Sequence, residues 1–289
     1  MVMNYIFQVI CVMVATAMFT LLERKTLGYI HLRKGPNKPP GLLVPFADAI
    51  KLMTKEYITP MSANSTAFLM APMILLIIPL LLWSMTSTKA EYFYSNLSVV
   101  LILCILSVSV YGTLLAGWSS NSKYALLGAI RVVAQSISYE VTLTVIFLHV
   151  MMFLMFSTSL SFVPLFLPML MITMIFFISC LADTNRSPFD FAEGESELVS
   201  GFNTEYSSVG FLIIFLSEYM SILFMSFLVA LFFMATNLYE MILITSLIGF
   251  LYIWARGTLP RFRYDQLMYL TWKTLLPTSL MSLLIFSCV

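Results

Sequence analysis

Residues 208–233 read SVGFLIIFLSEYMSILFMSFLVALFF, and Glu218 is the only charged residue among them. A helix of this length can cross the roughly 30 Å hydrocarbon layer of a membrane. Glu218 would lie roughly 15 Å deep at 1.5 Å per residue, where an ionised carboxylate is costly. The stretch therefore predicts a membrane span with a candidate functional acid, the alternative being a structural acid held protonated and hydrogen-bonded.

The rest of the chain has the same character. Hydrophobic residues make up 60% of the 289 positions and charged residues only 10%, too little charge to cover a soluble domain of this size. We therefore expect an all-α integral membrane protein, a single membrane domain with a bundle of about eight transmembrane helices and an amphipathic surface helix. The expected spans lie near residues 3–22, 66–84, 97–118, 125–156, 163–182, 208–233, 238–256 and 274–288.

The basic residues support this topology. The side reached after the first span is called the inner side, and of the 15 lysines and arginines only Lys89 falls in an outer loop. Such asymmetry is typical of the positive-inside rule, and it would disappear if one span were miscounted. Function is then expected at the inner face, whose polar loops cover residues 23–65, 183–207 and 257–273.

Some features are not expected in this chain. Residues 1–20 lack the basic start of a signal peptide or presequence, so a first transmembrane helix is favoured over a cleaved leader. The four cysteines are far apart without a CxxC pair, and the two histidines are isolated. The sequence therefore predicts neither a disulfide framework nor a metal or iron–sulfur site.

The first inner loop has two distinct parts. Residues 33–41, RKGPNKPPG, contain three prolines and two glycines and cannot form a regular helix. The part that follows predicts an amphipathic helix along the membrane surface. It would be either a lipid anchor or the floor of a lateral opening from lipid into a protein-covered site. Its apolar face holds Phe46, Ala49, Ile50, Met53 and Tyr57, and its charged face holds Asp48, Lys51 and Lys55.

The second inner loop is acidic, although basic residues otherwise gather on this side. Crowded carboxylates raise one another's pKa, so some of these acids could exchange protons near neutral pH. A solvated acidic loop is the alternative interpretation. The acids are Asp183, Asp190, Glu193, Glu195, Glu197 and Glu205, beside a single arginine, Arg186.

The fourth span is polar on two faces. A helix of this kind cannot expose either face comfortably to lipid, so we expect it inside the bundle. Glu140 is, like Glu218, an embedded acid and a functional candidate. At 100° per residue, Arg131, Gln135, Ser138 and Thr142 form one stripe, and Ser136 and Glu140 lie near the other side.

Several motifs together resemble one family, the chain 1 subunits of NADH–ubiquinone oxidoreductase (respiratory complex I). The resemblance covers essentially the whole chain. Local departures include Asp183, where the family more usually has Glu, and Val44, where it commonly has Gln. The motifs are Glu23-Arg24-Lys25, Arg33-Lys34-Gly35-Pro36-Asn37, FADAIKL at 46–52, SKYALLGAIR at 122–131, QSISYE at 135–140, TNRSPFD at 184–190, EGESELVSGFN at 193–203 and PRFRYDQ at 260–266.

The resemblance implies roles for particular residues. The first inner loop, its amphipathic helix and the acidic loop would bound a quinone chamber, and Arg24, Arg33 and Asp48 match its lining or entry positions. An acid-lined proton path would lead from the chamber toward the membrane arm. Its positions match Asp183, Asp190, Glu193, Glu195, Glu197, Glu140 and Glu218, with Arg131 beside the path.

The resemblance also implies partners. Ubiquinone would be the substrate, and the chain itself would bind no cofactor. NADH, FMN and the iron–sulfur clusters would belong to partner subunits, namely the quinone-module subunits of the hydrophilic arm, with further contacts to membrane-arm subunits and lipid and none to nucleic acid. The short chain, its 21 methionines and the missing presequence favour the mitochondrial inner membrane over a bacterial plasma membrane.

Three alternatives stay open. A secondary transporter or cation channel also has buried acids, but it would need helices broken near mid-membrane, and no Gly or Pro adjoins Glu140 or Glu218. A related subunit of a membrane-bound hydrogenase would keep the family resemblance without using quinone. A purely structural membrane anchor explains neither embedded acid.

Overall fold

A computed structural model describes residues 2–36, 41–86, 96–156, 169–190, 201–234 and 238–288. Every regular element in this part of the chain is a helix, which confirms the all-α class. Six of these helices are long and apolar enough to cross a membrane. The six stretches are Tyr5–Ile30, Ser65–Ser84, Val99–Ser119, Lys123–Met152, Ser208–Phe233 and Tyr239–Thr258.

The other two expected spans are not among these six stretches. The fifth corresponds to α6 (Leu170–Asp183), which is 14 residues long as described. The last belongs to a helical run formed by α10 (Tyr264–Tyr269), a π-helical turn (Leu270–Leu275) and α11 (Leu276–Cys288). The count of eight spans therefore stays a prediction.

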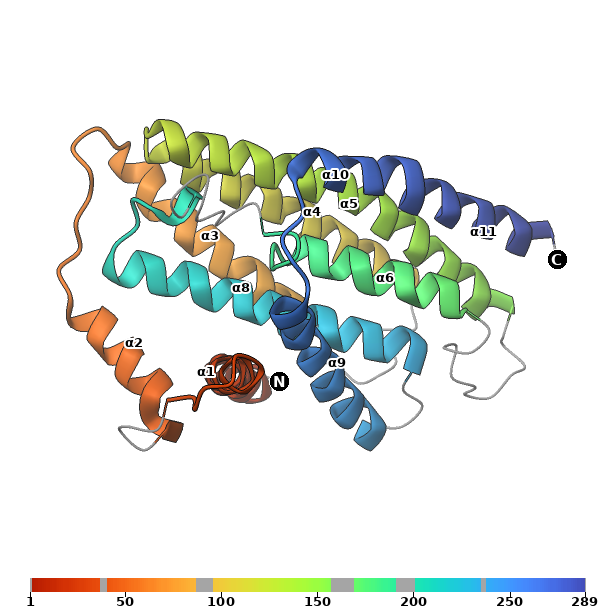
Figure 1. Cartoon of the computed structure of the whole chain (residues 1–289), viewed down its shortest axis with the longest axis horizontal. Coiled ribbons are helices and arrows are strands. Elements are labelled where there is room, and N and C mark those ends of the chain that lie inside the picture. Colours follow the sequence, from red (N-terminus) through yellow and green to blue (C-terminus); the bar gives the residue numbers. More distant parts are fainter. Residues whose placement is uncertain are drawn as a thin grey trace.

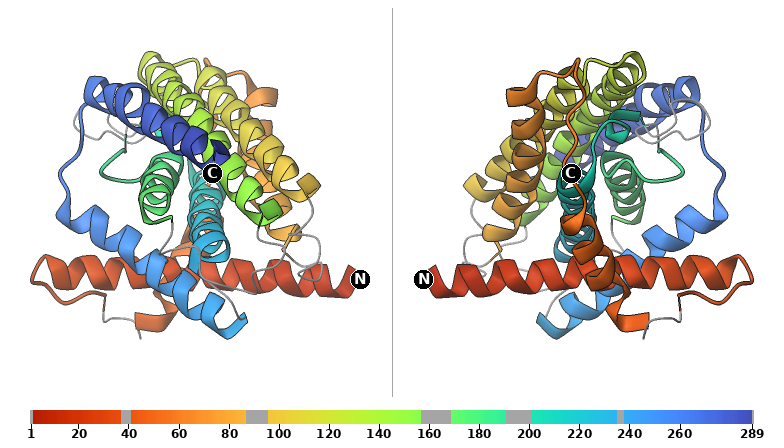
Figure 2. Two further views of the ribbon diagram at one scale, coloured as in Figure 1. Left: turned by 90° about the vertical axis from the view of Figure 1, so that its right-hand side faces the viewer. Right: turned by 90° about the vertical axis from the view of Figure 1, so that its left-hand side faces the viewer.

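Most of the helices form a bundle, and α1 crosses this bundle at a steep angle. In Figure 1, α3 (Ser65–Ser84), α5 (Lys123–Phe156), α6, α8 (Ser208–Val229) and α11 lie across the view, whereas α1 (Val2–Ile30) is seen almost end-on. Figure 2 shows α1 beneath the bundle. The other helices are α2 (Val44–Thr54), α4 (Asn96–Ser119) and α9 (Leu238–Thr258).

Helix α5 packs against several other elements of the bundle. It packs against α4, α6 and α11 and against the short turn Gly201–Asn203. Gln135, Ser138 and Thr142 on one stripe are buried, and Ser136 on the other side is buried as well. The predicted burial of polar residues on two faces of this helix is therefore confirmed, but Ile130, Ile137 and Leu148 are exposed, so α5 is not enclosed on every side.

Some helix boundaries differ from the expected loops. Helix α1 continues through Glu23, Arg24 and Lys25 to Ile30, so the expectation that the first inner loop begins at residue 23 is wrong as a helix boundary. Glu, Arg and Lys are good helix formers, so leaving the apolar layer does not end a helix. The last helical run also differs, because it begins at Tyr264 rather than near 274.

The amphipathic helix is present but shorter than the pattern suggested. Helix α2 begins after Leu43 with Pro45 in its first turn, where a proline is tolerated, and it ends at Thr54, so Tyr57 lies beyond it. The linker that follows is tied to the start of α8, where the backbone N–H of Ile58 donates to Ser207 Oγ over 3.1 Å.

A small cluster of buried apolar side chains closes the inner ends of α3, α4 and α8. The rings of Phe68 and Tyr206 stack with centroids 4.1 Å apart, and the Tyr206 hydroxyl lies 3.4 Å from Ser119 Oγ. Burial raises the pKa of Tyr206 to about 12. Its hydroxyl therefore stays neutral at physiological pH and contributes to the core without a charge.

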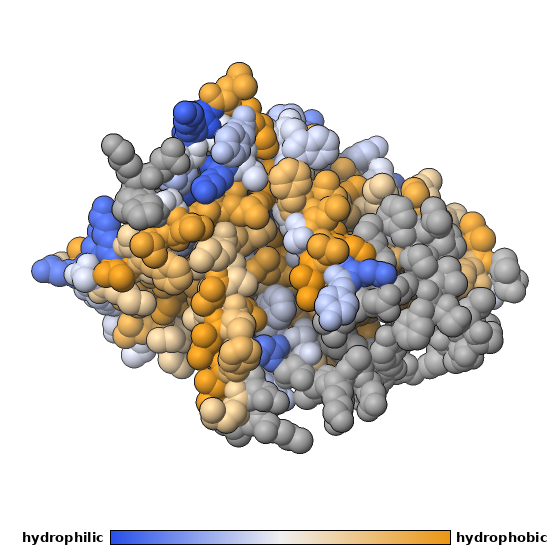
Figure 3. All heavy atoms as spheres, turned by 90° about the horizontal axis from the view of Figure 1, so that it is seen from below, coloured by the Kyte–Doolittle hydropathy of each residue, from blue (hydrophilic) through white to orange (hydrophobic). Residues whose placement is uncertain are grey.

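The outer surface suits a lipid environment. Figure 3 shows one face on which apolar side chains cover most of the described surface, interrupted by small hydrophilic patches. Large apolar residues are exposed along several helices, as expected where hydrocarbon rather than water is the solvent. On α1 and α9 they include Met3, Ile6, Phe7, Ile10, Ile242, Leu243, Leu247, Phe250 and Trp254.

Helices α4 and α5 approach closely at Gly117, where an added Cβ would lie 2.2 Å from the Cβ of Ala129. We expect Gly117→Val to force the helices apart, at a cost of about 1–3 kcal/mol, and to reduce the amount of assembled protein seen on native gels. The exposed Val108 on the same helix provides the control, because Val108→Leu should assemble normally. Normal assembly of Gly117→Val would contradict this packing.

Candidate functional site

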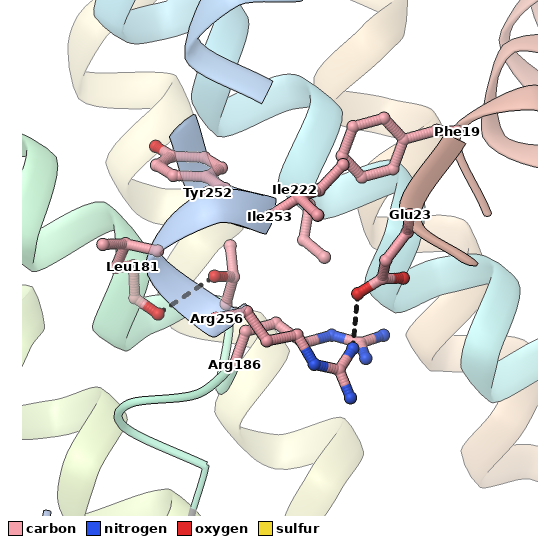
Figure 4. A pocket seen from close by; sticks show the side chains of 9 residues that line it. Phe19, Glu23, Leu181, Arg186, Ile222, Tyr252, Ile253 and Arg256 are labelled. Atoms are coloured by element: carbon pink, nitrogen blue, oxygen red, sulfur yellow. Dashed lines mark hydrogen bonds and ion pairs between the residues drawn. The ribbon is translucent and has the colours of Figure 1, made fainter. Parts of the chain in front are cut away.

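The inner end of α1 places an acid inside the protein. Glu23 is only 6% exposed, and it forms an ion pair with Arg256 of α9 (Figure 4). It also accepts a hydrogen bond from the Tyr219 hydroxyl of α8. A shielded carboxylate requires such partners, because an unpaired buried charge is strongly destabilising. Helix α1 therefore meets α8 and α9, which lie about 200 residues further along the chain, at one side chain.

Arg186 lies next to this pair (Figure 4). Its guanidinium carbon is 4.6 Å from the centroid of the Tyr219 ring, which is within the range of a cation–π contact. Its Nη2 is 3.4 Å from Oε2 of Glu218, with side-chain exposures of 10% and 21%. The embedded acid identified from the sequence, Glu218, therefore has an arginine partner.

A small cavity separates these charges from an apolar wall. Its charged side comes from α1, α9 and the turn after α6, and its apolar side from α1, α6, α8 and α9. The cavity has room for only about one water molecule, so it places charged and apolar side chains next to each other without itself holding a larger molecule. The lining residues are Phe19, Glu23, Leu181, Thr184, Arg186, Ile222, Tyr252, Ile253 and Arg256.

The acidic loop begins as a tight turn against α5. Helix α6 ends at Asp183, and Gln135 Nε2 donates hydrogen bonds to the carbonyl oxygens of Ala182 (2.8 Å) and Phe189 (2.9 Å). Asp190 is buried and lies 3.2 Å from Nη2 of Arg261. The turn is therefore held by α5 on one side and by the segment after α9 on the other.

The structure brings some of the predicted proton-path residues together. Glu140 of α5 is partly buried and interacts electrostatically with Asp183. Asp190 and Glu218 lie in separate ion pairs with arginines. Arg131 is on the same helix as Glu140, nine positions earlier and partly exposed. The remaining predicted acids, Glu193, Glu195 and Glu197, lie outside the described residues.

Two of the three predicted entry residues are in contact. Arg24 Nη1 lies 2.6 Å from Asp48 Oδ2, which joins α1 to α2. The side chains are 55% and 45% exposed, so the pair contributes at most about 1 kcal/mol. Arg33 is exposed in the turn after α1, where its N–H donates to the Gly28 carbonyl over 2.8 Å.

Four residues of this site were not assigned a role from the sequence: Glu23, Arg186, Tyr219 and Arg256. One signal was available, because Glu23 is an acid directly before two basic residues at the end of an apolar run. The positive-inside rule explains the basic residues there but not the acid. Nothing local in the sequence indicated that Tyr219 or Arg256 would meet it.

Comparisons with known proteins place the chain in a family. The family model for NADH dehydrogenase matches residues 3–287. The chain is 52% identical, over 96% of its length, to NADH-ubiquinone oxidoreductase chain 1 of Aedes aegypti, with 92% of that relative covered. For the proteins of the same name from Locusta migratoria and Balaenoptera physalus, the identities are 48% and 46%, over 99% and 96% of this chain and 94% and 92% of the relatives. The chain therefore belongs to the NADH dehydrogenase family, among proteins named NADH–ubiquinone oxidoreductase chain 1.

Proposed function

We propose that this chain forms part of the quinone chamber of complex I, together with a path of acids that couples quinone reduction to proton translocation. As a family member it is a subunit of NADH–ubiquinone oxidoreductase and a multi-pass protein of the mitochondrial inner membrane. The observation that carries the finer proposal is Glu23. This buried acid is paired with Arg256 and Tyr219 beside a cavity whose other wall is apolar.

A quinone has a long apolar tail and a small polar head, so its site must open from lipid into a polar pocket. Helix α2 supports an entry of this kind, because Phe46, Ile50 and Met53 are exposed apolar residues on it. On the same helix Asp48 is paired with Arg24. We place the entry along α2, lined by Arg24, Asp48 and Arg33, and the polar end of the chamber toward Glu23.

Reducing a quinone to a quinol consumes two electrons and two protons. Acids of the chamber that supply those protons would be left negatively charged until they are reprotonated. Neighbouring acids with interacting titrations can respond by exchanging protons. The interaction between Asp183 and Glu140 supports such a response within the bundle. We place on the path Asp183, Asp190, Glu193, Glu195, Glu197, Glu140 and Glu218, with Arg131 beside it.

The electrons must come from elsewhere in the complex. We assign NADH, FMN and the iron–sulfur clusters to partner subunits, with ubiquinone as the substrate that reaches this chain. Hydrophilic-arm subunits would close the chamber, and neighbouring membrane-arm subunits would continue the proton path. An ion transporter is not favoured, because α5 and α8 run unbroken through Glu140 and Glu218.

The Glu23 cluster gives the first test. Glu23→Gln removes the charge paired with Arg256, so we expect NADH-to-quinone turnover in assembled complex to fall roughly tenfold, about 1.4 kcal/mol in the barrier. Electron transfer to an artificial acceptor that bypasses the quinone should be unchanged. Glu56→Gln, at an exposed acid of the linker after α2, is the control. Normal quinone reduction by assembled Glu23→Gln would remove the main support for the chamber.

Glu140→Gln tests the proton path. The amide cannot exchange a proton with Asp183, so quinone reduction should slow, or protons pumped per quinone should fall, by severalfold in reconstituted complex. Glu240→Gln changes an exposed acid near the start of α9 and should leave both quantities intact. Unchanged turnover together with unchanged pumping would refute a role for Glu140.

The entry is tested by the Arg24–Asp48 pair. Asp48→Asn should raise the KM for quinone by up to about fivefold, in keeping with the roughly 1 kcal/mol available from an exposed pair, while kcat changes little. Exchanging the two residues (Arg24→Asp with Asp48→Arg) should restore much of the KM. A KM that the single variant leaves unaltered would place the entry elsewhere.

A further inference from the structure

Gln135 makes an unusual pair of hydrogen bonds. It is fully buried, and its single amide nitrogen donates to two carbonyl oxygens, those of Ala182 at 2.8 Å and Phe189 at 2.9 Å. The orientation of the amide is fixed by these partners, because turning it over would place its oxygen against two acceptors. Both hydrogens of the amide nitrogen are therefore used to hold backbone.

The two carbonyls mark the ends of the turn that carries two predicted path acids. Ala182 directly precedes Asp183, and Phe189 directly precedes Asp190. The turn is tight: the Asn185 N–H donates to the Ala182 carbonyl over 3.2 Å, and Asn185 has φ of 51°. One side chain thus ties both ends of a compact loop to α5.

Gln135 also shares its helix with Glu140. The two residues are five positions apart on the unbroken α5, so their backbones are separated by roughly 7.5 Å along the axis. Glu140 interacts electrostatically with Asp183. The residue that holds the Ala182 carbonyl, next to Asp183, and the acid whose charge acts on Asp183 therefore belong to one helix.

The amide oxygen of Gln135 argues against the view that this side chain only fills space. Among the described residues, Gln135 Oε1 is buried without a hydrogen-bond partner, and an unsatisfied buried acceptor is destabilising by about 1–3 kcal/mol. An apolar side chain of similar size would fill the space without that cost. The amide nitrogen must therefore supply something that an apolar residue cannot.

We infer that Gln135 is a positioning residue: by gripping both ends of the 182–189 turn it sets the spacing between Asp183 and Glu140, and with it the proton exchange between them. This inference rests on the function proposed above. The interaction of two charges inside a protein falls off with their separation and is weakly screened there. A loosened turn would therefore weaken the coupling of the two acids without removing either.

Two variants of similar size separate positioning from packing. Gln135→Leu removes both hydrogen bonds at every pH. Gln135→Glu keeps the shape, and its protonated acid can donate one hydrogen bond to a carbonyl, whereas its carboxylate can donate none and would face two acceptors. The measurement is NADH-to-quinone turnover in assembled complex from about pH 6 to about pH 9, bracketing neutrality, relative to wild type and normalised to an artificial acceptor that bypasses the quinone.

We expect Gln135→Leu to lose roughly tenfold in turnover across the range, equivalent to about 1.4 kcal/mol. Gln135→Glu should stay near wild type at the acidic end and fall toward the Leu variant as the pH rises. Should the Leu variant fail to assemble, the Glu variant still carries the test. Normal turnover of Gln135→Leu overturns the inference. So does a turnover of Gln135→Glu, relative to wild type, that does not change with pH. The proposed proton path fails separately, through normal turnover and pumping in Glu140→Gln.

Discussion

The structure depends on one constraint: a charge that enters the bundle must bring its counter-charge with it. Glu23 is buried because Arg256 and Tyr219 meet it, and Glu218 is tolerated in α8 because Arg186 lies beside it. These partners come from α1, α8, α9 and the turn after α6. Pairing therefore does more than neutralise charge, because it joins α1 to α8 and α9 where these helices cross.

Much of this architecture follows from the sequence. Apolar length and the distribution of basic residues predict spans and sidedness, because both reflect the transfer of side chains between water and hydrocarbon. The burial of Gln135, Ser136, Ser138 and Thr142 follows from the two polar faces of α5. The helix ends do not follow, because the membrane boundary and the end of a helix are set by different physics. In α1, Glu23, Arg24 and Lys25 end the apolar run but continue the helix.

The site was predictable only where a single residue carried the signal. Glu140 and Glu218 stand out because an acid in an apolar run is costly wherever its partner lies. The pairing of Glu23 with Tyr219 and Arg256 depends on how α1 crosses α8 and α9, and no local pattern encodes a crossing angle. The hydrogen bonds of Gln135 could not be predicted from the sequence, because they end on backbone carbonyls, which every residue possesses.

The same constraint connects the cavity to the embedded acid. Arg186 pairs with Glu218 and also lies over the ring of Tyr219, whose hydroxyl donates to Glu23. In a poorly screened interior, a change in the charge of Glu218 acts on the Arg186 guanidinium, and through Tyr219 on the carboxylate at the cavity wall. Neither Arg186 nor Arg256, the ion-pair partner of Glu23, can respond by losing a proton, because a guanidinium stays charged. Any response must therefore come from movement of these side chains, and a linked movement of this kind is what the coupling proposed above would require.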